Sequence, residues 1–439
     1  MRGFSLRWVI ASSILAASSA MSTHPLEQRP PNLHNLFHVP SFAGIGVTSI
    51  LAAPTSRSTE EATAFFVGTK RGKVKQVTMT PSCLDEISVL VNDVQDANGK
   101  ALKPYPIFSM MSVPKSSDAH SHHLLTGGGD RYVTVWETVD ENSDSSVEKE
   151  NQTRWHVKTQ LGPHTGWVKD LSYSYQPSTK DGSMVFSIGC NCIEVWKIAN
   201  SEYQHYCKLQ IESSVEMGST LSSDLLCLAT YSYSCDGGNR DGDDNTQNEN
   251  SCSPAYLVAG GVDGLLHRWA LHESFAHAGV SSAHDGRVNG IVVCKDLNML
   301  VSIGSDASVQ CREIGAIPFE AWSVTSLNLE AEGIWRGGEV SGSDSDASSV
   351  SVKITSLCVV LEDSNRAIAA IGTACGKVLL VEIVRCDTNV SVSLLKEHII
   401  EFEHAGAIHA LQSFRTRDYS YIITIGHSDG LSVWDVSLP

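Results

Sequence analysis

Cysteine is scarce in this sequence, with 12 residues in a chain of 439. A scaffold built on disulfides uses about 8–10% cysteine, so this class of protein is excluded. No two cysteines stand in a C-x-x-C pair, the usual element of a zinc ribbon or a redox motif. Cys235 and Cys252 enclose an acidic stretch, and we leave open whether they form a disulfide in an oxidising compartment or stay as two thiols.

Basic residues are also few, since 32 Lys and Arg face 49 Asp and Glu, which gives a formal net charge of -17. A surface of this charge repels the phosphates of nucleic acids and releases few of their counterions. The composition therefore predicts no nucleic-acid partner.

A long apolar run is missing, because the one in MRGFSLRWVIASSILAASSA is too short for the roughly 20 residues of a membrane-spanning helix. Two arginines, an apolar run and small residues make residues 1–20 similar to a secretory signal peptide. A mitochondrial or plastid transit peptide and an untargeted, cytoplasmic chain are the alternatives. We expect residues 1–20 to be a targeting segment, 21–32 a linker, and the mature chain to be soluble without a membrane span.

Familiar catalytic motifs are missing as well: there is no nucleophile elbow, H-E-x-x-H, P-loop or kinase signature. The sequence therefore predicts no catalytic, cofactor-binding or metal-binding residues. An active site built from separate segments of the chain is the alternative.

A repeated pattern runs through most of the chain. Each copy has an apolar stretch, a small residue, Gly, a turn, and an alternating strand that often ends in Trp, as in AYLVAGGVDGLLHRW and SHHLLTGGGDRYVTVW. The strand ends fall at residues 77, 136, 196, 269, 312, 381 and 434, which are 43 to 73 residues apart. Units of about 40 residues with four strands each describe the blades of a propeller.

These units resemble the WD40 repeat family from about residue 33 to Pro439. The resemblance implies an all-β fold, a single seven-bladed β-propeller over residues 33–439. Polar, acidic stretches at residues 140–151, 234–253 and 337–350 interrupt the units, and we expect them to be surface loops. Two segments, HTGWVKDL and FSIGCNCIEVW, are also similar to WD40 proteins of plants and algae, which favours the plastid among the possible destinations.

The family stabilises its blades with a network of His, Ser or Thr, Asp and Trp side chains, and this sequence carries only part of it. In the fifth unit Arg312 replaces the Trp. The positions that match the family are His164, His284, His404, Ser302, Asp306, Thr424, Trp136, Trp196, Trp269 and Trp434.

The resemblance implies a non-catalytic scaffold or adaptor that binds other proteins, acting as a monomer within a complex and without a cofactor. Its binding face is expected to include Trp167, Arg287 and Ala407, each of which follows shortly after a repeat histidine. Lys70 and Arg71 are expected nearby. Exposed Trp and Arg are common anchors of protein interfaces. The alternative is a hydrolase-like propeller enzyme with its site in the central channel.

Two local predictions complete the sequence analysis. The last unit lacks room for a fourth strand, so we expect Leu33 to Val39 to pair with the strand that ends at Trp434 and to close the ring. In FSIGCNCIEVW, Cys190 and Asn191 are predicted to form a tight turn in which Asn191 takes the positive φ, with Cys192 in a strand rather than at a metal site.

Overall fold

The structure, a computed structural model, is all-β in the part of the chain that it describes. The described residues are 32–39, 47–52, 63–79, 84–91, 105–115, 122–139, 154–176, 182–211, 224–232, 255–271, 275–315, 319, 322–332, 353–386, 389–396, 400–401, 406–415, 420–426 and 430–437. Residues 1–20, the three acidic stretches, Cys235 and Cys252 lie outside them, so the predictions on these segments stay predictions. Within the described residues, no helix has the length and hydropathy needed to cross a membrane.

The described strands form seven antiparallel sheets, of which six have four strands and one has five. The first sheet contains β2 (Val47–Ala52), β3 (Thr63–Thr69), β4 (Lys73–Met79) and β5 (Leu84–Val91). The second contains β6 (Ile107–Pro114), β7 (His122–Gly128), β8 (Val133–Val139) and β9 (Arg154–Leu161). The third contains β10 (Val168–Gln176), β11 (Gly182–Gly189), β12 (Cys192–Ala199) and β13 (Glu202–Gln210).

The remaining sheets follow in chain order. The fourth contains β14 (Leu225–Ser232), β15 (Ala255–Gly261), β16 (Leu265–Ala270) and β17 (His277–Ser282). The fifth contains β18 (Val288–Cys294), β19 (Met299–Gly304), β20 (Ser308–Glu313) and β21 (Val324–Asn328). The sixth contains β22 (Ile354–Glu362), β23 (Arg366–Thr373), β24 (Lys377–Cys386), β25 (Asn389–Leu394) and β26 (Ile400–Glu401). The seventh contains β27 (Ile408–Arg415), β28 (Ser420–Gly426), β29 (Gly430–Ser437) and β1 (Asn32–Val39).

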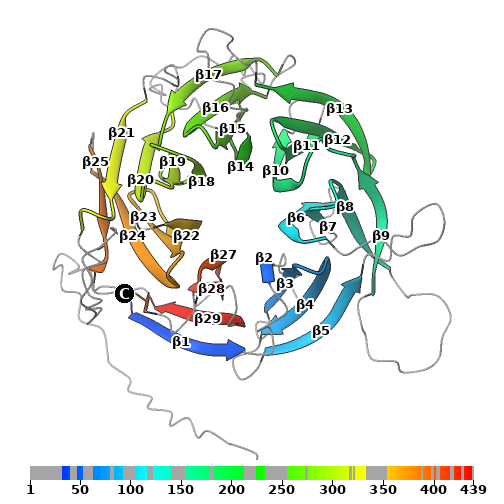
Figure 1. Cartoon of the computed structure of the whole chain (residues 1–439), viewed down its shortest axis with the longest axis horizontal. Helices are drawn as coiled ribbons and strands as arrows, with labels where there is room; N and C mark the ends of the chain where they lie inside the picture. The colour runs from blue at the N-terminus through cyan, green and yellow to red at the C-terminus, as the bar shows by residue number, and fades with distance from the viewer. Residues whose placement is uncertain are drawn as a thin grey trace, which may run out of the picture.

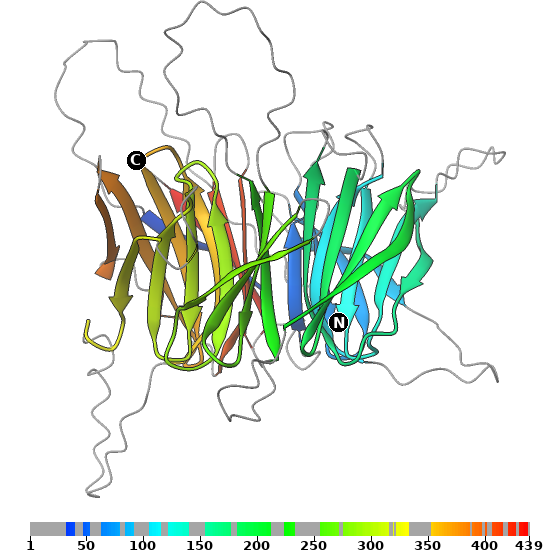
Figure 2. The same cartoon turned by 90° about the horizontal axis from the view of Figure 1, so that it is seen from above.

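The sheets lie around a common centre, with the first strand of each sheet innermost (Figure 1). The innermost strands contact one another in the order β2, β6, β10, β14, β18, β22 and β27, and β27 contacts β2. Seen from the side, the strands of the different sheets lie at the same height and form a disc of even thickness (Figure 2). One edge of every sheet therefore contributes to the same face of the molecule.

Hydrophobic clusters join neighbouring sheets. Seven clusters of buried side chains are present, and each combines residues from two adjacent sheets, including the seventh sheet and the first. Inner strands such as β23 are buried along nearly their whole length, because a neighbouring sheet covers each face. Outer strands such as β25 alternate between exposed and half-buried residues. This difference explains why the inner strands have continuous apolar runs.

The predicted pairing of the two chain ends is confirmed. Strand β1 runs antiparallel to β29, with Leu33 opposite Val436 and Val39 opposite Leu431. The seventh sheet thus takes three strands from the end of the described chain and one from its beginning. β1 forms its outer edge (Figure 1).

Candidate interaction face

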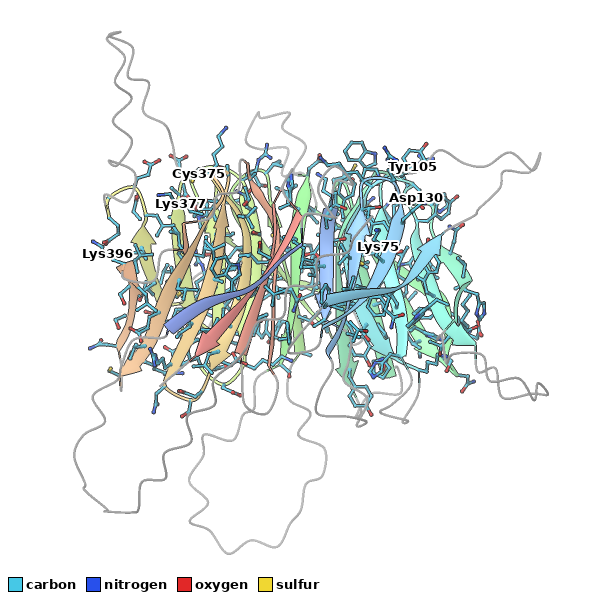
Figure 3. The ribbon with its side chains drawn as sticks, turned by 90° about the horizontal axis from the view of Figure 1, so that it is seen from below. Lys75, Tyr105, Asp130, Cys375, Lys377 and Lys396 are labelled. Carbon is cyan, nitrogen blue, oxygen red and sulfur yellow. The ribbon has the colours of Figure 1, made fainter. Side chains whose placement is uncertain are left out.

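The hairpin turns between the second and third strands of the sheets lie at one edge, beside the residues that precede the first strands. In the second sheet the Gly129 amide donates to the Pro106 carbonyl at 2.9 Å, and in the fifth the Ser305 amide donates to the Arg287 carbonyl at 2.9 Å. The fourth and sixth sheets make the same contact. We call this edge of the sheets the turn face. Tyr105, Asp130 and Cys375 mark it in Figure 3.

Three predicted binding residues occupy one repeated position on the turn face. Trp167, Arg287 and Ala407 each stand directly before the first residue of an innermost strand, and that first residue pairs with a Gly in all three sheets. The three positions are therefore structurally equivalent, and their role in binding a partner stays a prediction. Trp167 and Arg287 are exposed, whereas Ala407 is half-buried and offers little contact surface.

The register of every innermost strand is broken near its start, which lets one side chain leave the regular alternation. The shift follows the first residue of the strand, for example between Ile107 and Ser109 and between Val288 and Gly290. A bulge of this kind turns one side chain away from the regular alternation. In the second sheet the displaced residue is Phe108. Its ring stacks on Trp167, with centroids 5.5 Å apart and an interplanar angle of 25°.

The β3–β4 turn presents the predicted cations Lys70 and Arg71, both of which are exposed. The Gly72 amide donates to the Thr69 carbonyl at 3.1 Å, and the Lys73 amide donates to the Thr69 hydroxyl at 3.1 Å. Gly72 has a φ of 70°, which glycine adopts without strain. The turn is thus fixed by its own backbone and holds both charged side chains at the turn face.

The buried His164 connects the β7–β8 turn of the second sheet to the third sheet, close to the turn face. Its Nδ1 lies 3.0 Å from the Arg131 carbonyl, which can only accept, so Nδ1 carries the proton. Its Nε2 then accepts from the Ser187 hydroxyl at 2.7 Å, and Trp196 Nε1 donates to the same hydroxyl oxygen at 3.0 Å. This turn has Asn191, and a backbone carbonyl bonds Nδ1 where the Asp306 carboxylate does so in the fifth sheet.

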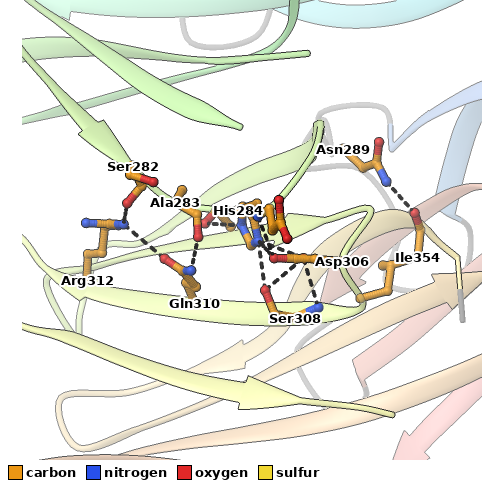
Figure 4. A network of polar contacts seen from close by, with 11 residues as sticks. Ser282, Ala283, His284, Asn289, Asp306, Ser308, Gln310, Arg312 and Ile354 are labelled. Atoms are coloured by element: carbon orange, nitrogen blue, oxygen red, sulfur yellow. Dashed lines mark hydrogen bonds and ion pairs between the residues drawn. The ribbon is translucent and has the colours of Figure 1, made fainter. Parts of the chain in front are cut away.

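His284 forms the corresponding network in the fifth sheet (Figure 4). Its Nδ1 faces the Asp306 carboxylate at 3.1 Å, and its Nε2 lies 2.9 Å from the Ser302 hydroxyl. The buried Arg312, at the expected place of Trp, donates to Ser281 at 2.9 Å and bonds the Ser282 carbonyl. Ser302 therefore has no tryptophan donor in this sheet.

The glycine before each turn leaves room for these histidines. A Cβ on Gly189 would lie 2.6 Å from the His164 Cβ, and one on Gly304 would lie 2.4 Å from the His284 ring. In these two sheets the packing of the imidazole against the backbone therefore explains the Gly of the repeated pattern.

The other predicted repeat residues have mixed outcomes. Trp136 is buried and donates to the Thr126 hydroxyl at 3.0 Å, and Trp269 is buried against the His277 ring. Trp434 is half-buried at the cluster between the sixth and seventh sheets. His404 lies outside the described residues, and of Thr424 only its place in β28 is described.

The Cys190–Asn191 turn forms as predicted, but the residue with positive φ is Cys190, at 60°, so the prediction for Asn191 is wrong. The Cys190 side chain packs over Gly166, where an added Cβ would lie 1.9 Å from its Sγ. Cys192 is buried in β12 on the side of Glu194, as predicted. Burial is the main reason that the pKa of the Cys190 thiol is raised. In the described part of the chain, no three His, Cys, Asp or Glu side chains gather closely enough to hold a metal ion.

Sequence reasoning missed the bonds that tie innermost strands together beneath the turn face. Ser49 donates to the Ile107 carbonyl at 3.0 Å, and Thr48 bonds the same oxygen. In the sixth sheet Thr355 donates to the Ile408 carbonyl at 2.5 Å. The signal was present, because the Thr-Ser pair recurs in VTSIL and ITSLC at the same register.

The buried histidines predict a pH dependence of stability. Burial is the main reason that the pKa of His164 lies below its ordinary value of 6.5. The unfolded chain therefore binds a proton below pH 6.5 more readily than the folded one, and stability is lost as the pH falls from there through the lowered pKa. Melting curves at pH 7.5 and 5.5 should show a smaller drop for His164→Gln than for the unchanged protein. Equal drops would contradict this.

In comparisons with known proteins, no family model matches this chain and no curated protein matches it. The function must therefore be argued from the residues themselves.

Proposed function

We propose that residues 33–439 form one seven-bladed propeller of WD40-like repeats, closed by the pairing of β1 with β29. Three observations support this: the seven sheets, the hydrophobic cluster between each neighbouring pair, and the contact of β27 with β2. The His–Ser–Trp and His–Ser–Asp contacts of the third and fifth sheets are of the kind that the WD40 resemblance implies.

The function of this propeller is to hold other proteins on the turn face, without chemistry of its own. One observation carries the proposal: Trp167 is 57% exposed although it stacks on Phe108. A large ring that is held in place and still accessible contributes binding area at little further cost in side-chain entropy. Arg287 occupies the equivalent position two sheets away, so contacts can spread over a rigid surface.

The double substitution Trp167→Ala and Arg287→Ala should release partner proteins that co-purify with the full chain. Each truncation at an interface anchor costs about 1–2 kcal/mol or more, so the pair should weaken binding at least tenfold. Tyr175→Ala is a suitable control, because Tyr175 is 65% exposed near the other end of β10. If the double variant keeps every partner, the turn face is not the binding face.

A further inference from the structure

The outermost strands of the sheets differ in how regularly they pair. In the part of the chain that the structure describes, β1, β5, β9, β13 and β17 each have a break in register against the neighbouring strand. The other two outermost strands, β21 and β25, pair without a break. Bulges and charged side chains commonly protect a sheet edge from the addition of another strand. β21 and β25 therefore lack the first of these protections.

β25 lacks the second protection as well. Its sequence is NVSVSL, whereas β5, β9 and β13 each contain two residues of the types Asp, Glu, Lys and Arg. β21 is also uncharged, but it has five residues against the six of β25. The apolar side chains of β25 pack on the cluster between the fifth and sixth sheets, and its polar side chains are exposed. β25 is thus the longer of the two regular, uncharged edges.

The backbone of β25 offers donors and acceptors at the rim of the molecule. Hydrogen-bonded and non-bonded pairs alternate along an antiparallel ladder, and the Leu395 amide donates to the Leu380 carbonyl at 2.9 Å. The residues whose backbone groups point away from β24 are therefore Val390, Val392 and Leu394. The Thr325 hydroxyl of β21 donates to the Val390 carbonyl at 3.3 Å, which agrees with this direction. Among the described strands, none pairs with this side of β25, since β26 pairs with β24.

The charge of the chain favours another protein over a second copy as the partner of this edge. The charged side chains next to β25 form ion pairs, namely Glu382 with Arg366, Arg385 with Glu313, and Lys396 with Glu332. The overall charge then dominates, and at a formal net charge of -17 two copies repel each other. The same charge attracts a segment that carries Lys or Arg.

We propose that β25 is a strand-addition site for an extended segment of a partner protein, β-branched and uncharged where it pairs, and basic on either side. An added strand gains affinity from main-chain hydrogen bonds and specificity from its alternate side chains. β-branched residues pack well beside the valines of β25. The site lies on the rim and not on the turn face, so it goes beyond the function proposed above (Figure 1).

The test uses the full chain and a fluorescent peptide, Lys-Lys-Val-Thr-Val-Thr-Val-Lys-Lys, with binding followed by anisotropy. Val392→Pro removes an amide donor from the free side and leaves the ladder bonds to β24, so it should weaken binding about fivefold or more. Val392→Ala is the matched control, because it also reduces the packing of this side chain but keeps the amide. It should leave binding within about twofold. A peptide of the same charge with Pro in place of the central Val should bind about tenfold more weakly.

Hydrogen exchange of the unchanged protein provides a second measurement that needs no variant. Bound peptide should slow exchange in the fragment that contains Val392 and Leu394, and it should leave the fragments of β9 and β13 unchanged. Exchange that slows elsewhere and not at β25 would overturn the inference.

Three further results would overturn it: no binding, equal binding of the two peptides, or equal losses for Val392→Pro and Val392→Ala. A dimer of the chain in sedimentation that Val392→Pro abolishes would assign the edge to a second copy instead. The scaffold proposal is judged separately, because Trp167→Ala with Arg287→Ala should release the cellular partners of the turn face and leave binding of the peptide unchanged.

Discussion

Removal of residues 1–42 should cause aggregation or a large loss of thermal stability, whereas removal of residues 1–20 should leave folding intact. The longer deletion removes β1, which pairs along β29 from Asn32 to Val39. It would expose the backbone groups of β29, and an unpaired strand edge is a template for association with other chains. The shorter deletion keeps every residue of this pairing.

Thermal unfolding and size-exclusion chromatography of the two truncated chains would measure the difference. A domain of this kind has no other strand to cover β29 among its described residues, since β28 already pairs with its opposite side. Equal melting temperatures and equal elution volumes would show that the propeller closes in another way. A third chain that begins at residue 31 should behave like the one that lacks residues 1–20, because its β1 is complete.

The strand pattern was predictable because it depends on local chemistry. Alternating apolar residues, a Gly before a turn and a terminal Trp indicate a hairpin wherever they occur, so β11 and β12 were found from FSIGCNCIEVW alone. The pairing of β1 with β29 was predicted from a count of strands rather than from any pattern of its own. The fourth strand of the last sheet must come from another part of the chain, and few segments outside the repeats could supply it.

The features that depend on distant contacts were not predictable in the same way. Nothing near Asn191 shows that the Arg131 carbonyl, on the preceding sheet, would replace the missing carboxylate beside His164. The displaced position of Phe108 could not be predicted, because a β-bulge has no fixed sequence signal and the residue lies in an ordinary apolar strand. The exposed Trp167 was predictable from its repeat position, but its stacking partner was not.

The two serine-centred networks predict a difference between two otherwise identical substitutions. In the third sheet Ser187 serves both His164 and Trp196, at 2.7 and 3.0 Å. In the fifth sheet Ser302 bonds His284 at 2.9 Å, while Arg312 makes its contacts elsewhere. Ser187→Ala therefore leaves two buried groups without their partner, and Ser302→Ala leaves one.

A buried polar group that loses its partner costs about 1–3 kcal/mol, so Ser187→Ala should lower the free energy of unfolding by about 2–6 kcal/mol and Ser302→Ala by about half as much. Both serines are fully buried and both substitutions remove one oxygen, so the loss of volume is matched. Urea denaturation of the two variants measures the difference. When Trp196→Phe is combined with Ser187→Ala, the additional loss relative to Ser302→Ala should disappear, because no indole donor is then left unpaired. Equal losses for the two serine variants would mean that the Trp196 bond contributes nothing to stability.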